Sequence, residues 1–229
     1  MLVKFSLFTH NCLARELHII YNITIENGGY MDSRVLFNIG YGLYVVTTKD
    51  NNDNGCIINT VMQVTSDPCQ IAIAVNKRNL TQQMISRTRK FNLSVLSEQA
   101  SFDIFKHFGY QSGRDVDKFA NFSDVKRSPN GLYYITQGTN SYMSAYVQQE
   151  IDLGTHSLFI GQLVAAEMLS EVPTMSYDFY QKNIKPKPQN ENKKGWRCKI
   201  CGYIYEGENL PQDYICPVCK HGAADFEKI

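Results

Sequence analysis

Between residues 42 and 169, polar and apolar positions alternate with the period of β-strands. Runs rich in β-branched and aromatic residues predict strands at Gly42–Thr48, Cys56–Thr65, Gln70–Val75, Asn92–Leu96, Tyr142–Ile151 and Ser157–Leu169. The Asn-, Asp- and Gly-rich stretch of residues 50–55 favours left-handed backbone conformations, so it predicts a hairpin between the first two strands. Helices are expected from Thr81 and near Ser101–Phe108. Many strands in mostly antiparallel order with few helices indicate a mainly β fold, a barrel with helical decoration.

Both ends of this region depart from the pattern. Residues 1–30 show neither strand nor helix period, and they precede Met31, after which Asp32 or Ser33 can cap a short helix. Residues 182–195 hold two prolines, five lysines, one glutamate and almost no apolar side chain, which indicates a flexible linker. The predicted organisation is a loosely attached extension at 1–30, a barrel at 31–181, a linker at 182–195 and a small module at 196–229.

Composition excludes some partners. With 43% hydrophobic and 20% charged residues and a formal net charge of +1, the chain has the composition of an ordinary soluble globular protein, not of a nucleic-acid or polybasic membrane binder. No apolar run reaches the length of a membrane span, and residues 1–30 lack the form of a signal peptide. Three of the seven cysteines, Cys12, Cys56 and Cys69, show no regular spacing. We therefore expect no disulfide framework and a reducing, cytoplasmic location.

The other four cysteines form two Cys-x-x-Cys pairs, Cys198 with Cys201 and Cys216 with Cys219. Thiolates three positions apart can face one ion, and two such pairs close a tetrahedral shell that suits zinc or iron. The metal would supply much of the folding energy of so small a module. Its aromatic residues would supply a small core; they are Trp196, Tyr203, Tyr205 and Phe226.

The run WRCKICGYIYEG, followed after a short loop by CPVCKHGAADFEKI, resembles rubredoxin in the short-loop form that is appended to rubrerythrins. Fourteen residues separate the two pairs, in keeping with the shortened loop. The resemblance implies a small C-terminal rubredoxin-like metal domain in which the four cysteines hold one iron, as Fe(SCys)4, and pass single electrons. The alternative is a structural zinc ribbon.

Short polar side chains gather on the first predicted strands, at Thr47, Thr48, Asn59, Thr60, Gln63, Thr65 and Ser66. Amides and hydroxyls at the rim of a strand can bind the edge of a flat heterocycle. Residues 76–81 (NKRNLT) open a predicted helix, and a helix N-terminus with amide, hydroxyl and cationic side chains suits a phosphate. Both features also have ordinary explanations, as solvent-facing strand residues and a plain helix cap.

The segments GCIINTVMQVTSDP, NKRNLT, FNLSVL and GTHSLFIGQLV together resemble the flavin reductase family, which has an FMN-binding split β-barrel. The resemblance implies contacts along the isoalloxazine and ribityl chain from Asn59, Thr60 and Val61, and contacts to the ring from Gln63, Val64 and Thr65. It implies phosphate binding by Lys77, Asn79 and Thr81. His156 matches a family histidine near the nicotinamide, or else is a barrel histidine bonded to a backbone carbonyl. The stretch Arg114–Phe119 is similar to a family segment near the site, or else is a solvated loop with internal charge pairs.

A flavin reductase barrel joined to a rubredoxin resembles the high-molecular-weight rubredoxins of anaerobes. That resemblance implies a homodimeric electron-transfer oxidoreductase in which NAD(P)H reduces FMN, the flavin reduces the iron, and an acceptor such as a flavodiiron NO or O2 reductase takes the electrons. A flavin is needed in such a chain because hydride carries two electrons and the iron accepts one at a time. Two alternatives remain: a plain flavin reductase, and a flavin-binding scaffold with a structural zinc ribbon.

Overall fold

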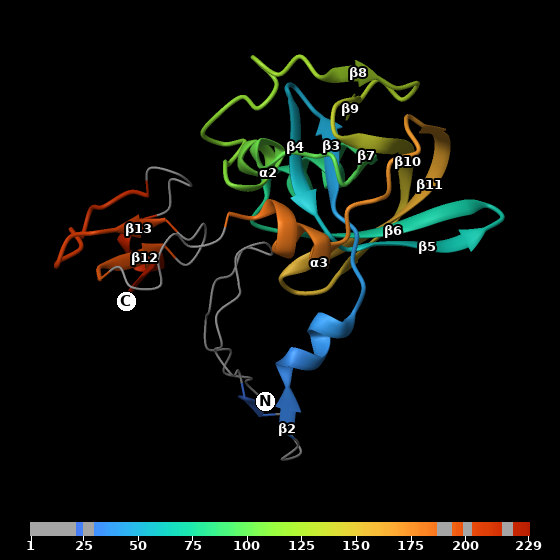
Figure 1. Ribbon diagram of the computed structural model, residues 1–229. Coiled ribbons are helices and arrows are strands. Elements are labelled where there is room, and N and C mark those ends of the chain that lie inside the picture. Colours follow the sequence, from blue (N-terminus) through green and yellow to red (C-terminus); the bar gives the residue numbers. More distant parts are fainter. Residues whose placement is uncertain (1–21, 25–29, 187–193, 199–202, 217–221) are drawn as a thin grey trace. The chain divides into compact units, whose positions relative to one another are not determined.

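The computed structural model describes residues 22–24, 30–186, 194–198, 203–216 and 222–229 (Figure 1). The chain divides into two compact units, one of residues 33–185 and one of the remainder. No helix in the described ranges is long and apolar enough to cross a membrane.

The unit of residues 33–185 is built on one antiparallel sheet of seven strands in the order β4-β3-β7-β10-β11-β6-β5. Five of the six predicted strands are present as single strands, and the mainly β fold is confirmed. The seven strands of the sheet are β3 Tyr44–Lys49, β4 Asp53–Ile58, β5 Val61–Ser66, β6 Cys69–Asn76, β7 Lys90–Leu96, β10 Thr139–Asp152 and β11 His156–Met168. The β5–β6 hairpin projects from the rest of the sheet (Figure 1).

One predicted strand is wrong in its extent. Cys56–Thr65 is not continuous, because Asn59 and Thr60 separate β4 from β5. These two strands are the opposite edges of the sheet, yet only two residues join them. At this corner the Thr60 carbonyl accepts from the amide of Ala74 at 3.2 Å, and the Thr60 hydroxyl donates to the Ala74 carbonyl at 2.7 Å. The corner therefore brings the two edges together and gives the sheet its barrel-like closure.

The barrel interior is apolar and draws on almost every strand. Its centre contains Val46, Ile58, Ile73, Ile85, Phe91, Leu93, Ala145 and Phe159, all buried. The alternation of QIAIAV on β6 places Ile71, Ile73 and Val75 inward, as the period of a strand requires. Gly161 lies against the Phe91 ring so closely that an added Cβ would be 2.7 Å from two ring atoms. The size of Phe91 is thus accommodated by the absence of a side chain at residue 161.

Helices cover parts of this sheet. α1 (Leu80–Thr88) and α2 (Phe102–Gly109) lie where the sequence predicts helices, and Ser33–Asn38 forms a short 3-10 helix after Asp32. The sequence interpretation missed α3 (Tyr177–Phe179) and the π-helix Tyr180–Ile184, as well as the two-stranded sheet of β8 (Val125–Arg127) and β9 (Tyr133–Ile135). The predicted linker therefore starts too early, since Lys182 is helical and pairs with Asp178 at 2.8 Å.

In the C-terminal module, β12 (Trp196–Cys198) lies between β13 (Ile204–Tyr205) and β14 (Phe226–Lys228), and a 3-10 turn covers Ala223–Asp225. Its small core is aromatic, as expected from the sequence. The Tyr214 ring meets the Phe226 ring edge-on at 5.4 Å and lies 4.6 Å from the Tyr205 ring. Trp196 Nε1 donates to the Glu208 carbonyl at 3.1 Å. Near the N-terminus of the chain, β1 (Asn22–Thr24) and β2 (Tyr30–Asp32) pair as an antiparallel hairpin.

Candidate flavin and metal sites

The start of α1 gathers several of the residues predicted to bind a cofactor. β6 ends at Asn76, and the chain turns through Lys77 into Asn79, whose extended backbone begins the helix. The Lys77 amide donates to the Thr155 carbonyl at 3.0 Å, so the β10–β11 turn lies directly beside this point. The Lys77 ammonium pairs with the Asp152 carboxylate from the same turn. Lys77, Asn79 and the β10–β11 turn therefore surround one end of the sheet.

His156 belongs to the same end. It is the first residue of β11 and pairs in register with Asn76, the last residue of β6. Its ring is half-buried, and Nδ1 lies 2.9 Å from the Thr155 hydroxyl. Burial lowers the pKa of His156 below 6.5, which favours the neutral imidazole at pH 7. The structure thus brings His156 close to Lys77, and it shows a hydroxyl partner for the ring.

β5 is an edge strand of the sheet. Gln63 and Val64 are exposed on it, whereas Asn59 and Val61 are half-buried. The Thr65 hydroxyl donates to the Pro68 carbonyl within the β5–β6 turn, and Gln63 Nε2 donates to the Thr65 carbonyl at 3.3 Å. Backbone groups and apolar side chains of β5, more than the Thr60 and Thr65 hydroxyls, are therefore free to meet a flat ring.

Thr47 and Thr48, two of the residues predicted to bind the flavin, have hydroxyl groups that are buried and already hydrogen-bonded within the barrel. Thr47 and Thr48 are each 1% exposed. The Thr47 hydroxyl donates to the Tyr133 carbonyl, and the Thr48 hydroxyl donates to the Lys90 carbonyl at 2.9 Å. A buried hydroxyl that already bonds the backbone is not positioned to bind a cofactor, so these threonines hold strands and loops together.

Thr81 is also buried, at 1% exposure, but it lies in the second position of α1. Its hydroxyl accepts from Asn54 Nδ2 at 3.1 Å, and Asn79 Nδ2 donates to the Cys56 thiol at 3.5 Å. The first turn of α1 is therefore held onto β4 by a polar cluster that the sequence interpretation did not foresee. When both faces of a strand are buried, the sequence does not show towards which face a polar side chain points.

The same cluster includes Lys118, which is buried, whereas residues 114–117 before it are exposed as a solvated loop requires. Lys118 is 3% exposed, and Nζ donates to the carbonyls of Gly55 at 2.8 Å and Phe108 at 3.1 Å. Burial lowers the pKa of Lys118 to about 8, and the thiol of Cys56 lies near enough to oppose that shift. Burial in turn raises the pKa of the Cys56 thiol.

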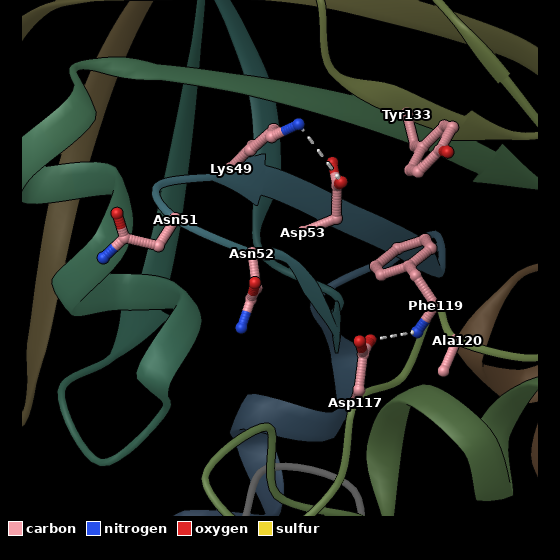
Figure 2. Close-up of a pocket in the computed structure, with 8 residues that line it drawn as sticks. All are labelled: Lys49, Asn51, Asn52, Asp53, Asp117, Phe119, Ala120 and Tyr133. Atoms are coloured by element: carbon pink, nitrogen blue, oxygen red, sulfur yellow. Dashed lines mark hydrogen bonds and ion pairs between the residues drawn. The ribbon is translucent and has the colours of Figure 1, made fainter.

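A polar cavity of about 280 Å³ lies between the β3–β4 turn and the loop that carries Lys118 (Figure 2). It is lined by Lys49, Asn51, Asn52, Asp53, Asp117, Phe119, Ala120 and Tyr133. Its charges are already compensated, because Asp53 forms two 2.8 Å bonds with Arg127 and lies 3.8 Å from Lys49. The Asp117 carboxylate accepts from the Phe119 amide at 2.9 Å (Figure 2). None of the residues predicted to contact the flavin directly lines it, although Asp117 and Phe119 belong to the segment Arg114–Phe119, and we assign it no ligand.

The metal site can be described for two of its four cysteines. Cys198 is 1% exposed and Cys216 is fully buried, whereas Cys201 and Cys219 lie outside the described residues. The Cys198 amide donates to the Tyr203 carbonyl at 2.8 Å, and Ile215 forms a β-bridge with Gly222. Backbone contacts therefore join the residues before each Cys-x-x-Cys pair to the residues that follow it. Buried thiols in a module this small fit a metal-thiolate centre.

A barrel of this topology with a polar helix start at one end, joined to a paired-cysteine module, is the architecture of a flavin-dependent oxidoreductase that carries an iron-thiolate domain. Two family models match: "Flavin reductase like domain" over residues 36–186 and "Rubrerythrin, rubredoxin-like domain" over residues 196–227. The chain belongs to the flavin reductase-like family, with a rubredoxin-like domain following the barrel.

Individual relatives agree with this assignment. The chain is similar to the high molecular weight rubredoxin of Moorella thermoacetica, at 35% identity over 87% of this chain and all of that protein. It is also 35% identical to the ferric-chelate reductase (NAD(P)H) of Archaeoglobus fulgidus, over 69% of this chain and 93% of that one. Among solved structures, the NADH:FAD oxidoreductase SgcE6 of Streptomyces globisporus aligns with a TM-score of 0.57 at 22% identity. It covers 62% of this chain and 84% of its own, and it shows the shared fold.

Proposed function

We propose that this protein passes electrons from NAD(P)H through FMN to a single iron held by Cys198, Cys201, Cys216 and Cys219. The observation that carries the proposal is the presence of both domains in one chain, together with the match to the whole length of a high molecular weight rubredoxin. Bound flavin would supply the conversion of a two-electron hydride into single electrons. The final acceptor is proposed to be a protein such as a flavodiiron NO or O2 reductase.

The flavin phosphate is proposed to lie at the start of α1. Lys77 and Asn79 reach this point from the β6–α1 turn, the Asn79 side chain forms no capping hydrogen bond, and the helix contributes the positive end of its dipole. Thr81 keeps its proposed place through its amide, since its hydroxyl bonds Asn54. The ring is proposed to lie along Asn59–Thr65, where Gln63 and Val64 are exposed.

His156 is proposed to orient the nicotinamide. A neutral, half-buried ring at the start of β11 offers a hydrogen-bonding group without placing a second positive charge beside an oxidised nicotinamide. The Thr155 hydroxyl fixes the ring by its contact with Nδ1 at 2.9 Å. In this proposal His156 holds no proton for the reaction and acts through position.

A second copy of the chain is proposed to cover the exposed apolar side chains of β5, β10 and β11. These are Met62, Val64, Tyr146, Val164 and Met168, with exposures between 42% and 62%. Apolar side chains gathered on one sheet are typical of an interface. We further propose residues 1–30 as an extension, the segment before residue 196 as a tether that lets the iron module reach both its donor and its acceptor, and a cytoplasmic location.

An anaerobic visible spectrum of the purified protein tests the proposal. Flavin and ferric-thiolate bands should both be present, and stoichiometric NADH or NADPH should bleach both. If iron is present but stays oxidised while the flavin bleaches, the two halves are not coupled and the chain acts as a plain flavin reductase. If zinc replaces iron in a protein expressed with ample iron, the C-terminal module is structural.

A further inference from the structure

The loop that follows α2 packs against the start of α1. Arg114 Nη1 donates to the Arg78 carbonyl at 3.4 Å. Gly113 lies so close to Asn54 that an added Cβ would be 2.3 Å from Oδ1, and Asn54 in turn bonds the Thr81 hydroxyl. The loop is therefore tied to the proposed phosphate site by two separate contacts.

Lys118, from the same loop, reaches beneath this site. Its Nζ donates to the carbonyl of Gly55, which precedes Cys56. The Cys56 thiol accepts from the side-chain Nδ2 of Asn79, the N-cap of α1. Lys118, Cys56 and Asn79 thus lie in sequence from the interior to the first turn of the helix.

The buried ammonium of Lys118 is hydrogen-bonded but not paired with a carboxylate of the described residues. Lys77 pairs with Asp152 and Arg127 with Asp53, but Lys118 forms no ion pair among the described residues. Two carbonyl groups satisfy hydrogen bonds and bring no net negative charge. A buried ammonium is costly under these conditions, and its cost falls when an anion binds nearby.

We propose that Lys118 is a specificity-determining residue that favours the phosphorylated flavin, FMN, over riboflavin, by placing a buried positive charge beneath the start of α1. The inference rests on the proposed function, which puts the flavin phosphate at that point. Lys118 acts without touching the flavin, because Cys56 and Asn79 lie between them. Water is excluded around it, so its charge is screened less than the exposed charges of Arg78 and Arg114.

The test compares the full chain, stripped of flavin, with its Lys118→Met variant, which keeps the length of the side chain and removes the charge. Dissociation constants for FMN and riboflavin are measured at pH 7 by quenching of flavin fluorescence. Lys126→Met is the matched control, because Lys126 is exposed on β8. We expect Lys118→Met to weaken FMN binding about tenfold or more and riboflavin binding by less than about twofold, and the control to change neither.

Equal weakening of both flavins would show that Lys118 only supports the fold of the site and would overturn the inference, as would unchanged FMN binding. If the unaltered chain binds neither flavin, the proposed function itself fails. This outcome is distinct, because it is seen before any variant is made.

A second measurement on the unaltered chain covers the case in which Lys118→Met does not fold. Calorimetry in buffers of different ionisation enthalpy at pH 8 should show proton uptake with FMN and none with riboflavin, since the pKa of Lys118 lies at about 8 before the anion binds. The groups around Lys118 are Cys56 on β4, His107 on α2, and Arg114 and Asp117 on its own loop. Burial raises the pKa of Cys56, so the thiol keeps its proton. Equal proton uptake with both flavins would overturn the inference.

Discussion

Lys118 should give the flavin-free barrel a stability that rises with pH. Burial places the pKa of Lys118 at about 8 in the folded protein, against 10.5 for an exposed lysine. Between these two values the unfolded chain binds more protons than the folded one, so the free energy of unfolding increases as pH rises. Below pH 8 both states carry the charge, and the slope vanishes. The full difference corresponds to about 3 kcal/mol, of which about 1 kcal/mol falls between pH 7.5 and pH 9.

Cys56 opposes this trend. Burial raises the pKa of its thiol above the 9.0 of an exposed cysteine, so above about that pH the folded state holds a proton that the unfolded chain has lost. Stability due to Cys56 therefore falls as pH rises. The comparison is best made between two proteins that both carry Cys56→Ala, one with Lys118 and one with Lys118→Met. Their difference isolates the amine.

The single tryptophan, Trp196, lies in the C-terminal module, so its fluorescence does not report on the barrel. Urea unfolding of the barrel is therefore followed by far-ultraviolet circular dichroism, at pH 7.5 and pH 9 and at constant ionic strength. The Lys118 protein should gain about 1 kcal/mol more than the Lys118→Met protein across this interval. An equal gain in the free energy of unfolding in both proteins would refute the view that burial lowers the pKa of Lys118. The absolute stability at one pH is not diagnostic, because methionine also leaves the carbonyls of Gly55 and Phe108 unbonded.

Three further variants have defined outcomes. Gly161→Ala should lower the free energy of unfolding by about 1–3 kcal/mol, because its Cβ would lie 2.7 Å from the Phe91 ring, and adding Phe91→Leu should recover part of the loss in the same urea assay. Asn92→Ala should cost about 2 kcal/mol or more, since the fully buried Asn92 amide donates to Ser128 and to the carbonyls of Leu132 and Tyr133; intact β8–β9 amide protection in hydrogen exchange would contradict this. Cys198→Ser should abolish the ferric-thiolate absorption while flavin content stays unchanged, and loss of both would show that the modules do not fold independently.

The strands of the barrel could be predicted because their pattern is a local property. QIAIAV on β6 places alternate residues on opposite faces whatever its neighbours are, and the structure confirms it. The break at Asn59–Thr60 could not be predicted in this way, since β-branched residues continue through both strands. What interrupts them is a hydrogen-bonded contact with Ala74, fourteen residues further along the chain. Pattern along one segment carries no information on such a partner.

The candidate site was predicted in part for the same reason. Lys77 and His156 lie together because β6 and β11 pair in register. The resemblance to flavin reductases implied that both residues lie near the cofactor, and composition did not. Thr47 and Thr48 have the right chemistry but point inward to carbonyl groups of other segments. The sequence analysis named the segment Arg114–Phe119 but not the burial of Lys118, because a lysine between aspartate and phenylalanine is expected to be exposed. Only the tertiary structure shows that its ammonium replaces water with two backbone carbonyls.

The order of strands in the barrel has a consequence for its synthesis. β3, β4 and β7 form one part of the sheet and β5 with β6 the other, and only the long β10–β11 hairpin lies between them. A nascent chain that ends before Thr139 therefore holds two separate sheets with unpaired edges at β7 and β6, and with the Phe91 side of the interior uncovered. During synthesis these edges stay unpaired until residues 139–168 leave the ribosome. In that interval the edges can bind chaperones or pair with the wrong strand. A truncation after β7 should consequently accumulate as an aggregate rather than as half a barrel.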